Sequence, residues 1–286
     1  MRTLLIAITI ALIPAALAAQ PMTGGVHTVV VARGDTLGRL GSRFGVDTAT
    51  IARDNGRALE TPLRVGETLS IDNRHIVPPL PTPTGTTLVI NVPQRMLFAT
   101  TSSGVTAYPV AVGRRDWPTP LGEFSIVAKE VNPTWDVPKS IREEARLAGR
   151  SLPLKVPPGP DNPLGAYWLG LSVGSVGVHG TNAPTSVYRV ATHGCIRLHP
   201  DDIAALFVQV AVGAKGVLLY EPVLLAVVGK EVFVEAHRDI YGRGPTDTLE
   251  FVRDRAYELG VLERMDWDRA TAVIRERAGI ARSVSR

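Results

Sequence analysis

The stretch Thr192-His193-Gly194-Cys195-Ile196-Arg197-Leu198 contains the only cysteine of this 286-residue chain. A second histidine–glycine pair, in His179-Gly180-Thr181, precedes it. A single thiol excludes an internal disulfide. Outside the cytoplasm a free thiol is open to oxidation, so exported proteins normally pair their cysteines or lack them. In an exported chain, a lone cysteine flanked by histidines and glycines therefore indicates a nucleophile.

The N-terminus has the features of a cleaved export signal. Met1-Arg2 gives a positive start, Leu4–Leu12 is apolar, and Ala16-Leu17-Ala18 fits a small-x-small cleavage site. An uncleaved anchor helix is the alternative, but the apolar run is shorter than the roughly 20 residues that a membrane span needs. We expect residues 1–18 to be a signal peptide and the mature protein to lie in the periplasm or cell envelope. Because no cysteine follows the site, a lipid anchor is not expected.

Composition places the chain among globular proteins and says little about its partner. Hydrophobic residues make up 45% of the sequence, which suffices for a buried core. The net charge of +4 favours anionic partners such as cell-wall polymers or lipid head groups. The basic residues are scattered and only 6% of residues are aromatic, so we expect no nucleic-acid partner.

Residues 26–72 read as a small strand–helix–helix–strand module. A strand is expected at His27–Val31, followed by a helix that Asp35 caps and that runs through Arg43. Asp47 is expected to cap a second short helix, which ends near Asn55-Gly56. A closing strand is expected over residues 63–71.

This module resembles a LysM domain. The motifs that carry the resemblance are Val31-x-x-Gly34-Asp35-Thr36-Leu37, Phe44-Gly45-Val46 and Val65-Gly66-Glu67-Thr68-Leu69-Ser70-Ile71. That family binds glycans containing N-acetylglucosamine, such as peptidoglycan. The resemblance places a glycan groove beside Gly34, Asp35, Thr36 and Leu37. Gly34 and Asp35 would also serve as turn and cap without any ligand. Gly38 and Gly41 weaken the expected first helix, because each glycine destabilises a helix by about 0.5–1 kcal/mol relative to alanine.

Residues 73–85 carry four prolines and no helical periodicity. We interpret them as a semi-extended linker that keeps two modules apart. A loop packed on either module is the alternative.

The residue pattern of residues 86–222 is typical of a β-rich domain. Strands are expected over residues 87–92, 95–99, 105–112, 122–127 and 169–178, with His179 at the end of the last. The proline-rich excursion over residues 131–165, with one polar helix at 139–149, is long enough to be a functional lid. Behind Cys195, Pro200 and two aspartates begin another helix. Residues 223–286 are expected to form an extension, with a strand pair at 223–228 and 231–235 and helices at 246–259 and 266–278.

The two His-Gly pairs suggest thiol chemistry. A thiol attacks as thiolate and needs a base, and His179 can face Cys195 from a neighbouring strand. His193 could share that face or shape the pocket. Gly194 lets backbone N–H groups approach a substrate, so the N–H groups of Cys195 and Gly194 could hold an oxyanion.

Each of these features also has a plainer interpretation. A lone cysteine is often a small buried apolar residue, and a histidine at a strand end is often only a surface residue. Zinc ligation by Cys195, His193, His199 and His179 is a further alternative, but the spacing matches no zinc pattern, so no metal is expected.

Residues 86–222 resemble the L,D-transpeptidase catalytic domain, in the branch of envelope enzymes typified by ErfK, YbiS, YcfS and YnhG. The matching words are Arg114-x-x-Trp117-Pro118-Thr119-Pro120-x-Gly122-x-Phe124, Asn132-Pro133-Thr134-Trp135, residues 156–165, Val178-His179-Gly180-Thr181-Asn182 and residues 192–198. The resemblance implies a multidomain protein: a mostly β sandwich or barrel-like catalytic domain, a small βααβ LysM module and a short helical C-terminal tail.

The resemblance also implies residue roles. Cys195 would be the nucleophile and His179 the base, with His193 and Gly194 on the oxyanion side. Arg197, Gly180, Thr192 and Trp135 would contact or order the substrate, and residues 132–165 would cap the cleft. Two departures stand out, since the family usually has serine at the position of Thr192 and glycine at that of Tyr188.

The implied reaction is a two-step acyl transfer without a metal or organic cofactor. Cys195 would attack the diaminopimelate carbonyl of a peptidoglycan stem tetrapeptide, release D-alanine and pass the acyl group to an amine. The amine could belong to another stem, giving a 3→3 cross-link, or to an envelope lipoprotein. Three alternatives remain open: hydrolysis at the same site by an L,D-carboxypeptidase or amidase, a non-catalytic peptidoglycan-binding protein, and a general cysteine protease.

Overall fold

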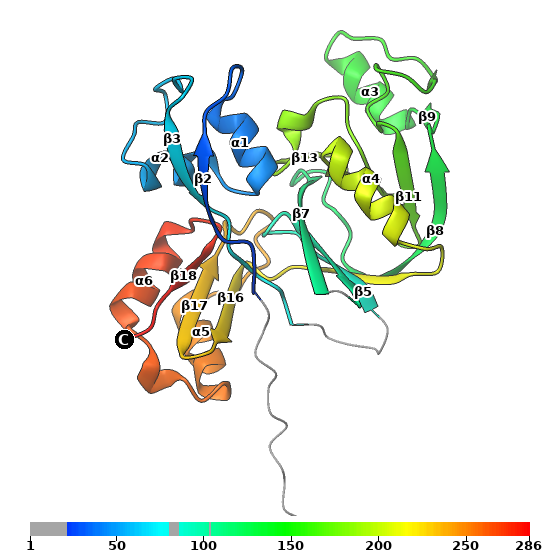
Figure 1. The fold of residues 1–286 in the computed structure, drawn as a ribbon. Coiled ribbons are helices and arrows are strands. Elements are labelled where there is room, and N and C mark those ends of the chain that lie inside the picture. The colour runs from blue at the N-terminus through cyan, green and yellow to red at the C-terminus, as the bar shows by residue number, and fades with distance from the viewer. Residues whose placement is uncertain (1–21, 80–85, 103) are drawn as a thin grey trace, which may run out of the picture.

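The computed structural model describes residues 22–79, 86–102 and 104–286. Figure 1 shows three units: a small N-terminal unit, a large β unit, and a C-terminal unit of sheet and helices beneath the first. The signal peptide expected at residues 1–18 lies outside the described residues. Every helix in the described ranges is too short or too polar to cross a bilayer.

The N-terminal unit has the expected strand–helix–helix–strand order. Its elements are β1 (Met22–Thr23), β2 (Val26–Val30), α1 (Leu37–Phe44), α2 (Thr48–Asp54), β3 (Thr68–Asp72) and β4 (His75–Ile76). β2 pairs antiparallel with β3, from Val26 opposite Asp72 to Val30 opposite Thr68. The helices bury Leu37, Leu40 and Ile51 against Leu69 and Ile71 of β3.

Three details of this unit differ from the sequence expectation. Asp47 stands at the N-cap of α2, but its side chain makes no capping hydrogen bond and instead accepts from Arg95. Thr36, not Asp35, caps α1, because the Thr36 Oγ1 accepts from the Arg39 N–H at 3.1 Å. The Asp35 carboxylate instead accepts from the Ala32 N–H at 2.8 Å and closes the preceding turn. The closing strand begins at Thr68 rather than at residue 63.

The large unit is a sheet that closes on itself, so the barrel-like β fold is confirmed. The strand order is β13-β7-β14-β12-β11-β8-β15-β5-β6, and β6 also pairs with β7. Leu97, Val110, Ile126, Leu169 and Ile196 lie in the apolar core. The strand bounds are β5 (Thr86–Asn91), β6 (Met96–Thr101), β7 (Gly104–Gly113), β8 (Gly122–Val131), β11 (Tyr167–Leu171), β12 (Gly177–His179), β13 (Val190–Thr192), β14 (Ile196–Leu198) and β15 (Lys215–Leu219).

The strand predicted over residues 169–178 is wrong, because this segment is a hairpin. β11 ends at Leu171 and β12 begins at Gly177, and the two pair antiparallel with Trp168 opposite His179. The short turn at Ser172-Val173-Gly174-Ser175 separates the two strands, and its apolar Val173 hides this break in the sequence pattern. Behind β14, the helix α4 (Pro200–Gln209) begins at the expected proline and buries Ile203 and Leu206. The 3₁₀ turn η1 (Pro184–Ser186) lies between β12 and β13.

The excursion between β8 and β11 contains a small hairpin and a helix. Its elements are β9 (Trp135–Asp136), α3 (Lys139–Leu147) and β10 (Lys155–Val156), and Figure 1 shows them at one end of the barrel. Asn162 is fully buried and joins the two ends of the excursion. Its Nδ2 donates to the Pro133 carbonyl at 2.8 Å, and its Oδ1 accepts from the Leu164 N–H at 2.9 Å.

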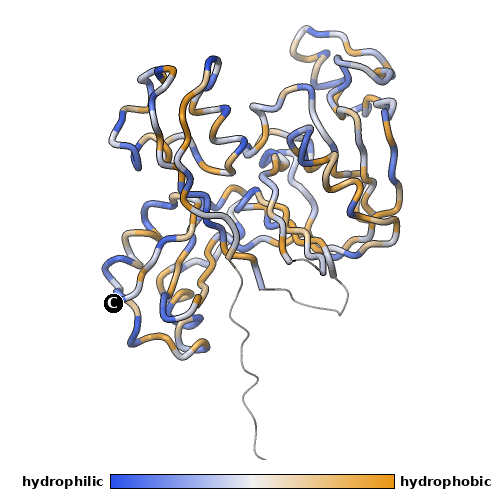
Figure 2. The backbone as a smooth tube through the Cα atoms, in the orientation of Figure 1, coloured by the Kyte–Doolittle hydropathy of each residue, from blue (hydrophilic) through white to orange (hydrophobic). Residues whose placement is uncertain are grey.

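The C-terminal unit has a core of its own. Its elements are β16 (Val223–Val228), β17 (Glu231–Ala236), α5 (Thr248–Glu258), the 3₁₀ turn η2 (Leu262–Arg264), α6 (Trp267–Glu276) and β18 (Ala281–Ser283). Val232, Val234, Val252, Met265 and Ala270 are buried together between sheet and helices. Figure 2 shows apolar stretches along these strands. The two helices are confirmed, but β18 makes a three-stranded sheet of the expected strand pair.

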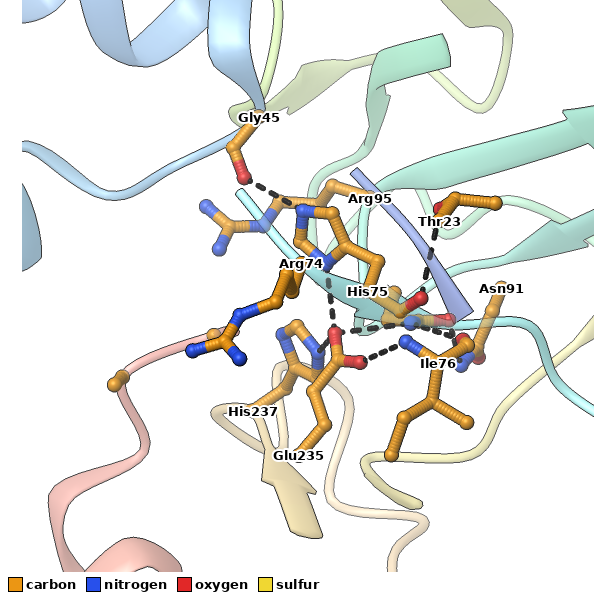
Figure 3. A network of polar contacts seen from close by, with 12 residues as sticks. Thr23, Gly45, Arg74, His75, Ile76, Asn91, Arg95, Glu235 and His237 are labelled. Carbon is orange, nitrogen blue, oxygen red and sulfur yellow. Dashed lines mark hydrogen bonds and ion pairs between the residues drawn. The ribbon is translucent and has the colours of Figure 1, made fainter. Parts of the chain in front are cut away.

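A buried carboxylate joins the three units (Figure 3). Glu235 of β17 is 0% exposed. It accepts from His237 Nε2 at 2.8 Å, from the Ile76 N–H at 2.6 Å and from Gln94 Nε2 at 3.0 Å, and it contacts His75 Nδ1 at 2.8 Å. Burial alone would raise the pKa of Glu235, but the two histidines lower it to about 2. The carboxylate therefore stays ionised inside the protein.

His75 extends this contact to the N-terminal unit. Its Nε2 lies 3.1 Å from the Gly45 carbonyl, while its Nδ1 faces Glu235. Carbonyls and carboxylates only accept hydrogen bonds, so bonding at both nitrogens requires the doubly protonated ring. A charged His75–Glu235 pair thus holds the chain just after β3 against the C-terminal sheet.

The expectation of separated modules is wrong for the described part of the linker. His75, Ile76 and Val77 are buried, and Ile76 packs against the C-terminal sheet. The N-terminal unit also contacts both others directly: Asp47 forms an ion pair with Arg95 at 2.9 Å, and the Thr50 hydroxyl donates to the Ala278 carbonyl at 2.9 Å. Ala278 and Ile280 even belong to the core of the N-terminal unit. The apolar residues after β3 explain why this segment packs.

Candidate active site

Strand pairing brings His179 and Cys195 to the same part of the barrel. β12 and β14 are parallel, with Val178 opposite Ile196 and His179 opposite Arg197. Side chains alternate along a strand, and directly paired residues share a face. His179 and Arg197 therefore share one face of the sheet, and Cys195 lies directly before β14, two residues before Arg197. The imidazole thus comes from a different strand than the thiol.

The hydrogen bond of His179 defines its protonation. The ring is buried, at 3% exposure, and its Nδ1 lies 2.7 Å from the Gly180 carbonyl oxygen. A carbonyl can only accept, so Nδ1 carries the proton and Nε2 keeps a free lone pair. Burial lowers the pKa of His179 to about 4, and the Arg197 charge acts in the same direction. At neutral pH the ring is therefore a neutral base.

Cys195 is half-buried and lies directly before β14. Burial raises the pKa of its thiol, while a backbone hydrogen bond from Gly177 and the Arg197 charge oppose this shift. Since the thiol and the imidazole both favour their neutral forms, the resting pair is thiol and imidazole. The thiol proton would then leave as the sulfur attacks, not beforehand.

Arg197 acts on both members of this pair. Its charge influences the pKa of Cys195 and that of His179, which places one guanidinium near both. Its Nη1 donates to the Ser186 hydroxyl at 2.8 Å. Its Nε is buried and has no hydrogen-bond partner within the part of the chain that the structure describes. An unused buried donor beside the thiol is suited to a substrate oxygen.

Thr192 shapes the turn that carries Cys195. Its Oγ1 donates to the Cys195 carbonyl at 2.6 Å and accepts from the Gly194 N–H at 3.2 Å. Gly194 has φ +107°, which L-residues with a Cβ rarely adopt. The Gly194 N–H thus has an internal partner in this structure. That the N–H groups of Cys195 and Gly194 hold an oxyanion stays a prediction.

His193 points to the excursion rather than to His179. Its Nε2 lies 2.6 Å from Glu144 of α3, and its ring packs against Trp117 with centroids 5.4 Å apart. Trp135 is half-buried on β9. Across residues 22–79, 86–102 and 104–286, no hydrogen bond or ring contact joins Trp135 to Cys195 or His179. The structure therefore brings together Cys195, His179, Gly180, Thr192 and Arg197, with His193 and Trp135 at the lid.

Sequence reasoning missed Trp168 and Gly177. The Trp168 ring stacks on the His179 ring, with centroids 5.8 Å apart and an interplanar angle of 25°. It lies directly over Gly177, where a Cβ would come within 2.4 Å of the indole. A glycine at this position therefore lets the indole reach the imidazole. Recognition of the β11–β12 hairpin would have placed Trp168 opposite His179.

Thr119, within the motif Trp117-Pro118-Thr119-Pro120, supports the loop that carries Cys195. Its Oγ1 donates to the Gly194 carbonyl at 2.9 Å and accepts from the Gly113 N–H at 2.9 Å. The residue is buried. It thus ties the end of β7 to the turn that carries Cys195.

The glycan-binding candidates lie in the N-terminal unit, apart from Cys195. Gly34 and Thr36 are exposed and Asp35 is half-buried, all in the loop between β2 and α1. Leu37 is buried in the core of the unit, so its side chain is not offered to a ligand. The exposed part of this candidate groove is the turn itself.

Tyr188 adopts a backbone conformation that glycine adopts readily, with φ +60°. For a bulky residue this costs on the order of 1–3 kcal/mol. The Arg95 guanidinium lies over its ring at 3.9 Å, and the Arg95 Nη1 donates to the Tyr188 carbonyl at 3.1 Å. The Tyr188 hydroxyl contacts the Gly279 carbonyl at 3.4 Å. These contacts hold the loop before β13 in place and offset the strain.

Comparison with known proteins assigns two parts of the chain. A family model described as the L,D-transpeptidase catalytic domain (YkuD) matches residues 85–225, and one for the LysM domain matches residues 29–72. "Probable L,D-transpeptidase ErfK/SrfK" of Escherichia coli (strain K12) is 31% identical over 212 residues, covering 69% of this chain and 66% of that protein. YkuD of Bacillus subtilis (strain 168) is 30% identical over 182 residues, covering 63% of this chain and 90% of that protein.

The similarity is partial in length. The matches span 66%, 62% and 51% of the E. coli relatives ErfK/SrfK, YcfS and YbiS. Among solved structures, L,D-transpeptidase 3 from Mycobacterium tuberculosis superposes with a TM-score of 0.37 and 16% identity, covering 47% of this chain and 60% of that one.

Proposed function

Because this chain belongs to the L,D-transpeptidase catalytic-domain family, we propose that it is a peptidoglycan L,D-transpeptidase in which Cys195 is the nucleophile. The observation that carries the proposal is the chain's one thiol, placed directly before β14, the strand that pairs with the end of β12 where a buried, neutral His179 stands. The free Nε2 of that ring supplies the base that an uncharged thiol needs. An unused Arg197 donor beside it supports substrate binding.

The first half-reaction is acylation of the thiol. The sulfur attacks the carbonyl of the third stem residue, diaminopimelate, as its proton passes to His179 Nε2. The N–H of Cys195 donates to the developing oxyanion, a role whose loss typically costs about 2.7–4 kcal/mol. His179 returns the proton to the departing nitrogen, and D-alanine leaves with its amine intact.

The second half-reaction transfers the acyl group to an amine. The amine attacks the thioester while His179 Nε2 accepts its proton, and the thiol is restored. A diaminopimelate amine of a second stem gives a 3→3 cross-link. A lysine amine of an envelope lipoprotein would attach that protein to the wall instead. The acid–base route needs no metal or organic cofactor.

The remaining units fit action at the cell wall. In this proposal residues 1–18 direct export to the periplasm or cell envelope, and residues 26–72 bind the glycan through the loop at Gly34, Asp35 and Thr36. Residues 73–85 connect to the catalytic domain at 86–222, and residues 223–286 form the third unit. The packing of this third unit on both others supports a structural role for it.

Water as the acceptor would make the same site an L,D-carboxypeptidase or amidase. The two reactions are separated by incubating the protein with disaccharide tetrapeptide, with and without a diaminopimelate-containing acceptor stem, and analysing the muropeptides. We expect cross-linked dimer in the presence of the acceptor. Tripeptide alone would contradict transfer, and no turnover by protein that still sediments with wall sacculi would indicate a binding protein only.

A further inference from the structure

The Glu144 carboxylate of α3 contacts two donors, Arg114 and His193, next to the loop that carries Cys195. Its Oε1 accepts from Arg114 Nη2 at 2.9 Å, and its Oε2 lies 2.6 Å from His193 Nε2. Arg114 Nη2 and His193 Nε2 are themselves 3.4 Å apart. Both oxygens of one carboxylate are therefore bound, one by each donor. The hydrogen bonds from His193 and Arg114 lower the pKa of Glu144, so it is ionised at neutral pH.

The two donors belong to the barrel, close to Cys195. Arg114 directly follows β7, and its backbone N–H donates to the Thr192 carbonyl at 2.9 Å. His193 is two residues before Cys195, and the Trp117 ring packs on it. The positions of both donors are thus fixed by the loop that carries the nucleophile.

The acceptor belongs to a segment that is weakly attached. In α3 only Ala145 is buried. The side chains of Arg114, Glu144 and His193 are 32%, 39% and 26% exposed, so solvent reaches the cluster. Ion pairs with this much exposure contribute little to stability. A competing carboxylate could replace Glu144 at small cost, while Asp116, 3.2 Å from Arg114, would remain on the solvent side.

We propose that Arg114 and His193 form a binding site for a free carboxylate of the stem peptide, which Glu144 occupies in the unliganded protein. This inference rests on the proposed function for the identity of the ligand. A stem tetrapeptide offers two candidates, the C-terminal carboxylate of D-alanine and the second carboxylate of diaminopimelate. Either would make the same two contacts that Glu144 makes now.

The test measures binding without turnover. In the Cys195→Ala background, the dissociation constant of disaccharide tetrapeptide is measured by calorimetry for Glu144→Gln, Arg114→Gln and the matched control Glu143→Gln. Glu143 lies one residue away on the same helix and pairs only with Arg146, at 2.7 Å. We expect Glu144→Gln to tighten binding by about three- to tenfold, Arg114→Gln to weaken it by about tenfold or more, and Glu143→Gln to leave it unchanged.

The ligand itself identifies the carboxylate. Two tetrapeptides are compared, one amidated at the C-terminus and one amidated at the diaminopimelate carboxylate. The carboxylate that binds Arg114 is the one whose amidation makes the dissociation constant insensitive to Arg114→Gln. The proposal is overturned if Glu144→Gln binds the peptide equally or more weakly while circular dichroism shows that the variant is folded. Glu144 would then support the excursion or contact the peptide itself. A protein that fails to transfer acyl groups but shows this binding pattern would refute only the transferase function.

Discussion

At the scale of single residues, the proposed reaction depends on the pair of Cys195 and His179. Removing the imidazole leaves a thiol whose pKa burial has raised and that has no base. We predict that His179→Ala slows acylation of Cys195 by stem peptide or a carbapenem by about 10²-fold or more. Stopped-flow measurement of acylation, with His199→Ala as the control histidine, checks this. Equal rates in both variants would remove His179 from its assigned role.

The protonation of His179 makes a separate prediction about pH. Burial lowers its pKa from the ordinary 6.5 to about 4, so the ring stays a base well below neutrality. The acid limb of the acylation rate should therefore fall near pH 4. A profile of acylation rate between pH 3.5 and 8 checks this, and an acid limb near pH 6.5 would show that the ring is solvated rather than buried.

The sequence could identify this pair because its signal is local. Both residues belong to short motifs that contain glycine, and the sequence pattern around them indicates where strands alternate with loops. The contacts of His193 could not be read in this way, since Glu144 lies 49 positions away on a helix with no apolar periodicity that fixes its orientation. The hydrogen bond from the Gly194 N–H to the Thr192 hydroxyl likewise could not be predicted from the sequence.

At the scale of elements, the buried Asn162 side chain joins the two ends of the excursion between β8 and β11. Asn162 bonds to Pro133 and Leu164, so replacing it leaves buried backbone groups without partners. We predict that Asn162→Ala lowers the free energy of unfolding by about 1–3 kcal/mol and speeds amide exchange in residues 132–165.

Asn182→Ala is the matched control for this change. Asn182 is exposed, and its Nδ2 makes a single contact of 3.3 Å with the Pro160 carbonyl. Hydrogen exchange followed by mass spectrometry compares the two variants. The same exchange in both would mean that the excursion does not depend on Asn162.

Element boundaries were predicted best where a breaker residue stands at the end. Pro200 marks the start of α4, and Asn55 marks the end of α2, as expected. The prediction failed where an apolar residue sits in a turn, as Val173 does between β11 and β12. It also missed β18, whose three residues Ala281–Ser283 form a strand only because β17 lies beside them.

At the scale of the whole molecule, the buried Glu235 connects all three units. Replacing it with alanine leaves His75 buried without a counter-charge and His237 Nε2 without its hydrogen-bond acceptor. We predict that Glu235→Ala destabilises the protein by about 3–5 kcal/mol, whereas Glu231→Ala, at the exposed start of the same strand, has a small effect. Thermal unfolding checks both, and equal melting temperatures would contradict a structural role for the junction.

The same carboxylate sets the behaviour in acid. Its folded-state pKa of about 2 lies below the ordinary 4.5, so the unfolded chain takes up the proton first as pH falls. The stability it contributes is complete above pH 4.5 and is lost as pH falls through 2. The arrangement of the units could not be predicted from sequence, because His75 and Glu235 are 160 positions apart and neither belongs to one of the recognised motifs.

The most direct test of the account is the intact mass of the protein after incubation with disaccharide tetrapeptide. We predict a covalent adduct on Cys195 equal to the donor minus D-alanine, absent in Cys195→Ala and strongly reduced in His179→Ala. An unmodified Cys195 in folded protein, under conditions where D-alanine is still released, would contradict the proposal that this thiol carries the acyl group.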